Sequence, residues 1–231
     1  MSGTVTVASF VDLRTFAEGV TVTPGDYPGA RTALPLPPGP VSVEAIRLAA
    51  GSGTASSAAD EFVIVLAGRL TLNGLVLSPG ESAVVPGNVA TAWQAEAGTL
   101  ALAMRCASGP AGADNIVAID EGAELAPSGA PLAALLVGET PSCRNHTDYR
   151  SANGEFLCGT WDSTPYHRLP MRYRHYELMH LLEGTVSFRD EAGRTGTFTQ
   201  GDVFLVEQGA ECSWLSTTQV KKVYAIYRPA E

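Results

Sequence analysis

An internal repeat constrains the fold of this chain more than any other feature. The segments 61–68 and 177–184 each begin with Glu and end with Gly, and each has an apolar run between them. The segments 79–93 and 200–214 each have Gly as their second residue and Trp as their last. The offset grows from 116 to 121 residues, so the second copy carries a five-residue insertion, which we place in the charged hairpin sequence 189–194. Such a repeat indicates two copies of one domain.

Short apolar runs separated by Gly, Pro, Asn, Asp and Ser recur along all 231 residues, whereas apolar residues at helical spacing are scarce. This pattern predicts an all-β fold of sandwich or barrel type. The small residues of 107–114 resemble a linker, so we expect domains at 1–114 and 115–231, each large enough to have its own core. The segment 116–137 could pair with the strands of either domain.

Charge and hydropathy exclude several classes of partner. The net charge is −9 and no basic cluster is longer than the pair 221–222, so we expect no nucleic-acid partner. The apolar stretches are strand-sized and the first basic residue is Arg14, so we expect a cytoplasmic protein with no membrane span and no signal peptide. The four cysteines form no CxxC pair, and reduced thiols are the expectation, with one disulfide left open.

The repeated motifs resemble the cupin superfamily, whose first motif is roughly G-x5-H-x-H-x3–4-E-x6-G and whose second is G-x5-P-x-G-x2-H-x3-N. The second copy is similar to ureidoglycine-aminohydrolase-like cupins at 159–165, 176–184, 201–202, Trp214 and 222–224. The resemblance covers residues 155–230 closely and 40–105 more loosely. It implies two tandem cupin barrels, that is, double-stranded β-helices or jelly rolls, of which the N-terminal one is degenerate.

The family's metal ligands are two His and a Glu from the first motif and a His from the second. In the first copy the His positions fall within 54–57 and on Thr91, which offer no transition-metal ligand. We therefore expect Glu61 to be a carboxylate that is hydrogen-bonded to neighbouring hydroxyl groups.

In the second copy the usual His positions fall within 170–173, and Cys212 replaces the His of the second motif. Strand alternation places four side chains on one inward face, those of Tyr173, His175, Glu177 and Met179. The set His175, Glu177 and Cys212 could hold a divalent metal such as Zn, Fe or Mn. The alternative is a buried polar network without metal.

The residues expected to contact a ligand are Trp161, Tyr173, Met179, Trp214, Lys222 and Tyr224. The favoured function is a small-molecule-binding protein that lacks the full metal site. One alternative, implied by the resemblance, is a metal-dependent hydrolase of a small polar nitrogen-containing metabolite with Glu177 as the catalytic group. A second is a metal-free sugar isomerase with His175 and Tyr224 as its acid–base pair. Whether the chain is an enzyme stays open.

Several other residues carry weaker expectations. His146 and His167 lie in loop-like sequence, although His167 could reach the barrel mouth, and Arg172 or Arg174 could clamp a carboxylate. His180 lies on the face opposite Glu177, with Leu178 and Leu182. That apolar face needs cover, either from the sister barrel or from a second chain in a homodimer.

Overall fold

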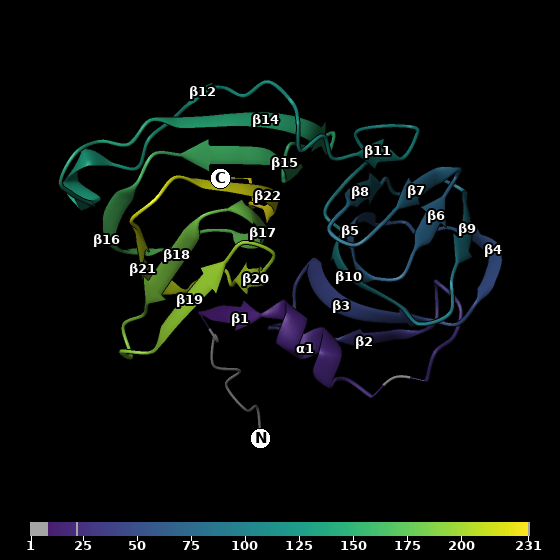
Figure 1. Ribbon diagram of the computed structural model, residues 1–231. Coiled ribbons are helices and arrows are strands. Elements are labelled where there is room, and N and C mark those ends of the chain that lie inside the picture. Colours follow the sequence, from purple (N-terminus) through teal and green to yellow (C-terminus); the bar gives the residue numbers. More distant parts are fainter. Residues whose placement is uncertain (1–8, 22, 231) are drawn as a thin grey trace.

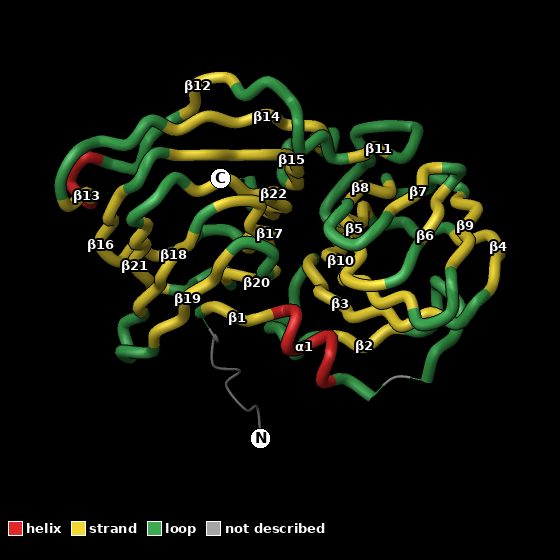
Figure 2. The backbone as a smooth tube through the Cα atoms, in the orientation of Figure 1, coloured by secondary structure: helices red, strands yellow, loops and turns green. Residues whose placement is uncertain are grey.

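Two β-barrels lie side by side in the computed structural model of the chain (Figure 1, Figure 2), which describes residues 9–21 and 23–230. Each barrel is built from two antiparallel sheets, and apolar residues that alternate along the strands pack between these sheets. The predicted all-β fold with two barrels is confirmed.

The first barrel consists of a six-stranded sheet and a four-stranded sheet. In spatial order the six strands are β11 (Val117–Ala118), β8 (Ser82–Val85), β5 (Asp60–Ala67), β10 (Thr99–Cys106), β3 (Val41–Leu48) and β2 (Arg31–Ala33). The four strands are β4 (Gly51–Ala55), β9 (Thr91–Ala95), β6 (Leu70–Leu72) and β7 (Leu75–Leu77).

The second barrel consists of a seven-stranded sheet and a five-stranded sheet. The seven strands are β1 (Phe10–Asp12), β20 (Val203–Val206), β17 (Tyr176–Glu183), β22 (Val220–Tyr227), β15 (Phe156–Ser163), β14 (Cys143–Arg150) and β12 (Ala126–Ser128). The five strands are β13 (Leu136–Val137), β16 (Tyr166–Arg172), β21 (Glu211–Ser216), β18 (Thr185–Arg189) and β19 (Thr195–Thr199). A short 3-10 helix, η1 (Ala133–Leu135), precedes β13.

Two short strands pair with the other barrel, not with the barrel formed by their own half of the sequence. Strand β1 pairs with β20 of the second barrel, and β11 pairs with β8 of the first. The segment 116–137 is therefore divided, because β12 and β13 pair with β14 and β16 of the second barrel. The domain boundary at residue 115 stays a prediction, and strands cross it in both directions.

Helix α1 (Leu13–Gly19) connects β1 to the first barrel (Figure 1). Asp12 caps its N-terminus by accepting a hydrogen bond from the backbone N–H of Thr15. Leu13 and Ala17, one helical turn apart, are fully buried in the core that the two barrels share.

The sequence repeat corresponds to a structural repeat. Strands β5 and β17 carry the two motif glutamates, and both end at a glycine with positive φ, 74° at Gly68 and 84° at Gly184. A Cβ at Gly184 would lie 2.1 Å from the carbonyl oxygen of Gln219, so this turn requires glycine. The hairpin of β6 and β7 has three paired rows, whereas the equivalent hairpin of β18 and β19 has five. The extra residues of the second copy therefore lie in the hairpin of β18 and β19.

The two barrels share one hydrophobic core. It contains Val43, Phe62 and Leu102 from the six-stranded sheet together with Leu178 and Val223 from the seven-stranded sheet, all with no exposed surface. Leu182 packs against the same cluster. The sister barrel therefore covers the apolar outer face of β17, and a homodimer stays a prediction.

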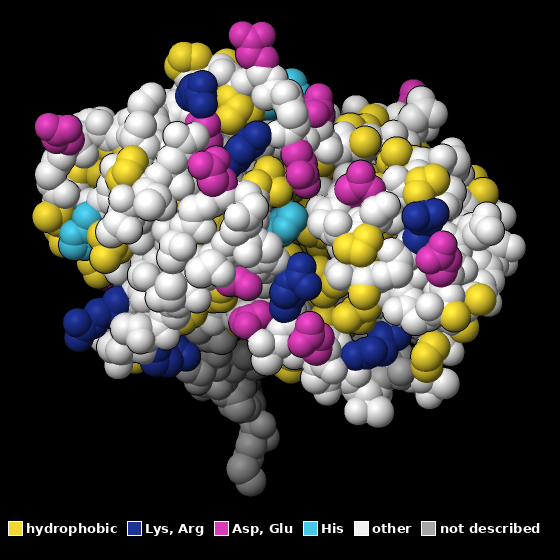
Figure 3. Space-filling model, in the orientation of Figure 1, with side chains coloured by type: hydrophobic (Ala, Val, Ile, Leu, Met, Phe, Trp, Pro, Cys, Tyr) yellow, Lys and Arg dark blue, Asp and Glu magenta, His cyan; other side chains and the backbone are white. Residues whose placement is uncertain are grey.

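Among the described residues, no helix has the length and apolar character needed to cross a membrane. All four cysteines are free and buried. On the face shown in Figure 3, Lys and Arg side chains are interspersed with Asp and Glu rather than gathered into a basic stripe.

Candidate functional site

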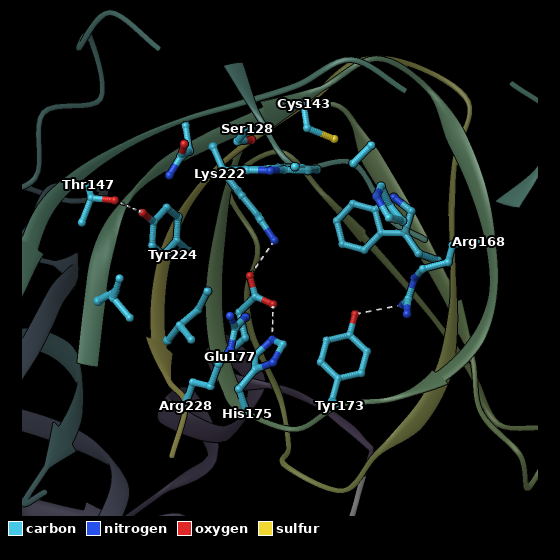
Figure 4. A pocket seen from close by; sticks show the side chains of 18 of the residues that line it. Ser128, Cys143, Thr147, Arg168, Tyr173, His175, Glu177, Lys222, Tyr224 and Arg228 are labelled. Carbon is cyan, nitrogen blue, oxygen red and sulfur yellow. Dashed lines mark hydrogen bonds and ion pairs between the residues drawn. The ribbon is translucent and has the colours of Figure 1, made fainter. Parts of the chain in front are cut away.

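A cavity of about 510 Å³ lies inside the second barrel, between its two sheets (Figure 4). One wall comes from β14, β15, β17 and β22 of the seven-stranded sheet, and the opposite wall comes from β16 and β21. Five of the six predicted ligand-contacting residues line it: Trp161, Tyr173, Trp214, Lys222 and Tyr224. Met179 is fully buried behind this wall.

A buried ion pair lies on the wall formed by β17 and β22. The Lys222 ammonium donates to Oε1 of Glu177 at 2.7 Å, and Nε2 of His175 lies 3.2 Å from Oε2 of the same carboxylate. Burial alone would raise the pKa of Glu177, but the Lys222 charge and the contact with His175 hold it well below its ordinary value. Glu177 is therefore a stable carboxylate between two basic side chains.

Aromatic rings enclose the Lys222 ammonium. Its Nζ lies 4.7 Å from the ring centre of Trp161 and 5.1 Å from that of Trp214, and it lies 3.1 Å from the Met179 sulfur. Trp214 also stacks on Tyr166, with ring centres 5.6 Å apart. Cation–π attraction and the Glu177 carboxylate together offset the cost of burying the ammonium.

On the opposite wall, Arg168 of β16 is only 3% exposed. Its Nη2 donates to the Tyr173 hydroxyl at 3.1 Å and to the Cys212 carbonyl at 3.3 Å. Its Nη1 is buried with no hydrogen-bond partner in the described part of the chain. The Arg168 charge lowers the pKa of Tyr173, but burial is the larger effect and leaves that pKa raised. The guanidinium therefore has an unused donor beside the cavity.

The donor set does not fit a metal ion. Within residues 9–21 and 23–230, no three His, Cys, Asp or Glu side chains are grouped to hold one, so His175 and Glu177 meet but do not form a three-ligand set with Cys212. The Lys222 ammonium already occupies one oxygen of Glu177. Burial raises the pKa of the Cys212 thiol to about 11, which disfavours the thiolate that a metal would need.

In the first barrel, too, cationic side chains contact the motif glutamate. Arg31 binds both oxygens of Glu61, at 2.6 and 3.1 Å, and Arg105 lies 3.4 Å from it. The expectation that hydroxyl groups satisfy Glu61 was incomplete, because the Tyr27 hydroxyl contributes but guanidinium groups are the main partners. Only a small cavity of about 110 Å³ remains beside this cluster.

Two further histidine and tyrosine predictions have specific contacts in the structure. The Tyr224 hydroxyl contacts the Thr147 hydroxyl at 2.9 Å and the His146 carbonyl at 3.2 Å. His167 does not line the cavity, and its backbone pairs with Val137 and Leu215.

The arginine beside the cavity was missed by the sequence reasoning. Arg172 and Arg174 are exposed and do not line the cavity, whereas Arg168 does. The strand register shifts between Arg168 and Met171. Counting every second residue back from Glu177 therefore places the Arg168 side chain on the outer face of the barrel, whereas it lies on the inner face. Alternation counted forward from Tyr166 would have found it, because both residues face inward.

The family model that matches is the EutQ-like cupin domain, over residues 150–224. A solved structure of a protein of unknown function in the DUF861 family, from Pseudomonas syringae pv. tomato, is 30% identical, with a TM-score of 0.82, covering 89% of this chain and 92% of that chain. Among curated proteins no sequence matches this chain.

Two further solved structures show the same fold at lower identity. The Ylba protein of Escherichia coli, also of DUF861, is 15% identical with a TM-score of 0.59, covering 100% of this chain and 96% of that chain. A cupin 2 conserved barrel domain protein from Leptotrichia buccalis is 12% identical with a TM-score of 0.58, covering 97% of this chain and 98% of that chain.

Proposed function

This chain belongs to the DUF861 family of the cupin superfamily, and from that premise we propose that its second barrel binds a small organic carboxylate without a metal ion. The observation that carries the proposal is the buried Arg168, whose Nη1 has no partner. An unpaired buried donor costs about 1–3 kcal/mol, and an acceptor that reaches it removes that cost. A carboxylate suits this donor, because a hydrogen bond between a guanidinium and an ionised acceptor is charge-assisted and therefore strong.

The cavity supports a ligand of metabolite size. A volume of about 510 Å³ lies in the range of small-molecule sites, which combine apolar walls with a few placed polar groups. Trp161, Tyr166 and Trp214 supply the apolar wall, and Arg168 and Lys222 supply the charged groups. A carbon skeleton can lie against the rings while its carboxylate faces Arg168.

A binding role fits the charges better than acid–base catalysis does. A general base works best when its pKa lies near the working pH, whereas Lys222 and His175 lower the pKa of Glu177. The same ion pair disfavours the metal-dependent hydrolase to which the ureidoglycine-aminohydrolase resemblance points. In the isomerase alternative, the Tyr224 hydroxyl would have to leave its contacts with Thr147 and the His146 carbonyl.

Isothermal titration calorimetry with a series of small carboxylic acids tests the proposal. We expect binding that survives treatment of the protein with a chelator, and a loss of about 10-fold to 100-fold in affinity for Arg168→Gln, since hydrogen bonds to a charged group are worth about 1.5–3 kcal/mol. Arg172→Gln, an exposed arginine on the same strand, is the matched control and should bind like the wild type. Loss of binding on chelation, or full affinity in Arg168→Gln, would contradict the proposal.

A further inference from the structure

The charges that line the cavity are unbalanced in a way that Arg168 alone does not explain. Four cationic side chains line it, those of Arg150, Arg168, Lys222 and Arg228, against the single carboxylate of Glu177. This excess of positive charge occurs in a chain whose net charge is −9. Lys222 and Glu177 neutralise each other, so three guanidinium groups remain.

Two of these guanidinium groups belong to the wall opposite Arg168. Arg150 ends β14 and pairs with Leu157, which pairs in turn with Ile226, two residues before Arg228. Both arginines are exposed, and neither forms an ion pair with any described residue. Arg168 belongs to the five-stranded sheet across the cavity, and Figure 4 shows Arg168 and Arg228 on opposite sides.

The part of the cavity between Arg168 on one side and Arg150 and Arg228 on the other is suited to an uncharged carbon skeleton. Trp161 and Trp214 present ring surfaces there, and Leu157 and Ile226 continue the apolar lining towards Arg150 and Arg228. A ligand with one acidic group would fill one end and leave the positive charge at the other end unmatched. Electrostatic complementarity therefore favours acidic groups at both ends of the ligand.

We propose that the cavity selects dianionic ligands, in which two carboxylates are joined by a short carbon skeleton. One carboxylate binds Arg168, and the other binds Arg150 and Arg228 near the opening. The proposal rests on the proposed carboxylate-binding function and adds the number and placement of the acidic groups. It identifies Arg150 and Arg228 as specificity-determining residues.

The test compares α,ω-dicarboxylates of about three to eight carbons with monocarboxylates of equal length by isothermal titration calorimetry, lengths that suit a cavity of this size. At its best length, a diacid should bind the wild type about 10-fold more tightly than the matched monoacid, because it gains a second charge-assisted contact. In the double variant Arg150→Gln/Arg228→Gln, that ratio should fall to about twofold or less. Arg172→Gln should retain the wild-type ratio.

The outcomes separate this inference from the proposed function. If monoacids bind and diacids bind no more tightly at any length, carboxylate binding stands and selection of dianions is overturned. A diacid preference that survives in Arg150→Gln/Arg228→Gln also overturns it, provided that the thermal unfolding midpoint shows a folded variant. If no acid of either series binds, the proposed function itself fails.

Discussion

At the scale of single residues, the two motif glutamates have cations as partners. Lys222 binds Glu177 and Arg31 binds Glu61, so each carboxylate is satisfied without a metal ion. Side-chain exposure is 7% for Lys222 and 10% for Glu177, so the pair is shielded from water. Breaking a buried pair leaves an uncompensated charge, which costs far more than the intact pair contributes.

This predicts the behaviour of Lys222→Met. The variant should lose about 3–5 kcal/mol in free energy of unfolding, since it strands the Glu177 carboxylate, and urea denaturation measures the loss. The double variant Lys222→Met/Glu177→Gln should recover most of it, because neither charge remains. Lys221→Met, at a lysine whose ammonium donates to the Glu121 carbonyl and does not contact Glu177, is the control. Equal stability of Lys222→Met and the wild type would show that the pair is not needed.

The sequence predicts the motif residues better than their partners. Glu61 and Glu177 could be found because both glutamates and their glycines recur at fixed spacing. Arg31 could not, because it pairs with Glu61 across 30 residues and the second copy has no counterpart to indicate it. The spacing of the motifs does not reveal which cationic side chain will lie beside each glutamate. That depends on how other strands pair in the folded protein.

At the scale of elements, β1 is the segment whose position was least predictable. It is three residues long and pairs with β20 of the opposite barrel. Phe10 packs against the hairpin residues Phe188 and Phe198, with ring centres 5.8 and 6.4 Å away. By contrast, the hairpin insertion was predictable, since charged and Gly residues mark the turn locally.

Phe10→Ala tests how much strand β1 contributes to the stability of the second barrel. Phe10 is half-buried, so we expect a loss of about 2 kcal/mol in free energy of unfolding, below the 3–5 kcal/mol of a fully buried Phe. Val76→Ala, an exposed strand residue at 48% exposure, should change stability by less than about 0.5 kcal/mol. A similarly small effect for Phe10→Ala would mean that β1 pairs without contributing to the barrel.

At the scale of the whole molecule, the shared core makes the two barrels one structural unit, and His180 lies within that interface. It is 6% exposed, and its Nδ1 has no hydrogen-bond partner among the described residues. The repeat places the apolar Ile64 at the equivalent position of the first copy. Burial and the nearby charge of Arg14 lower the pKa of His180 from 6.5 to about 4.

The stability of the interface should therefore depend on pH. Because the folded pKa lies below the unfolded one, the unfolded chain binds the extra proton between pH 6.5 and 4, and stability falls as the pH falls through that window. Between pH 7 and 5 the loss attributable to His180 should be about 2 kcal/mol. It is measured as the difference between wild type and His180→Ile in urea denaturation. His167→Gln should keep the wild-type dependence, and an unchanged dependence in His180→Ile would contradict the assignment.

The pairing of β1 with β20 also sets an order of events during synthesis. Phe10 leaves the ribosome early, but its partner Val206 is translated almost two hundred residues later. At about 5–20 residues per second, the first strand waits roughly 10–40 s for its partner. The first barrel can form during this interval, whereas the second barrel can pair its edge strand β1 only once β20 has been made. A nascent chain interrupted before β20 would therefore leave β1 unpaired. Its free backbone N–H and C=O groups could then pair with strands of other chains.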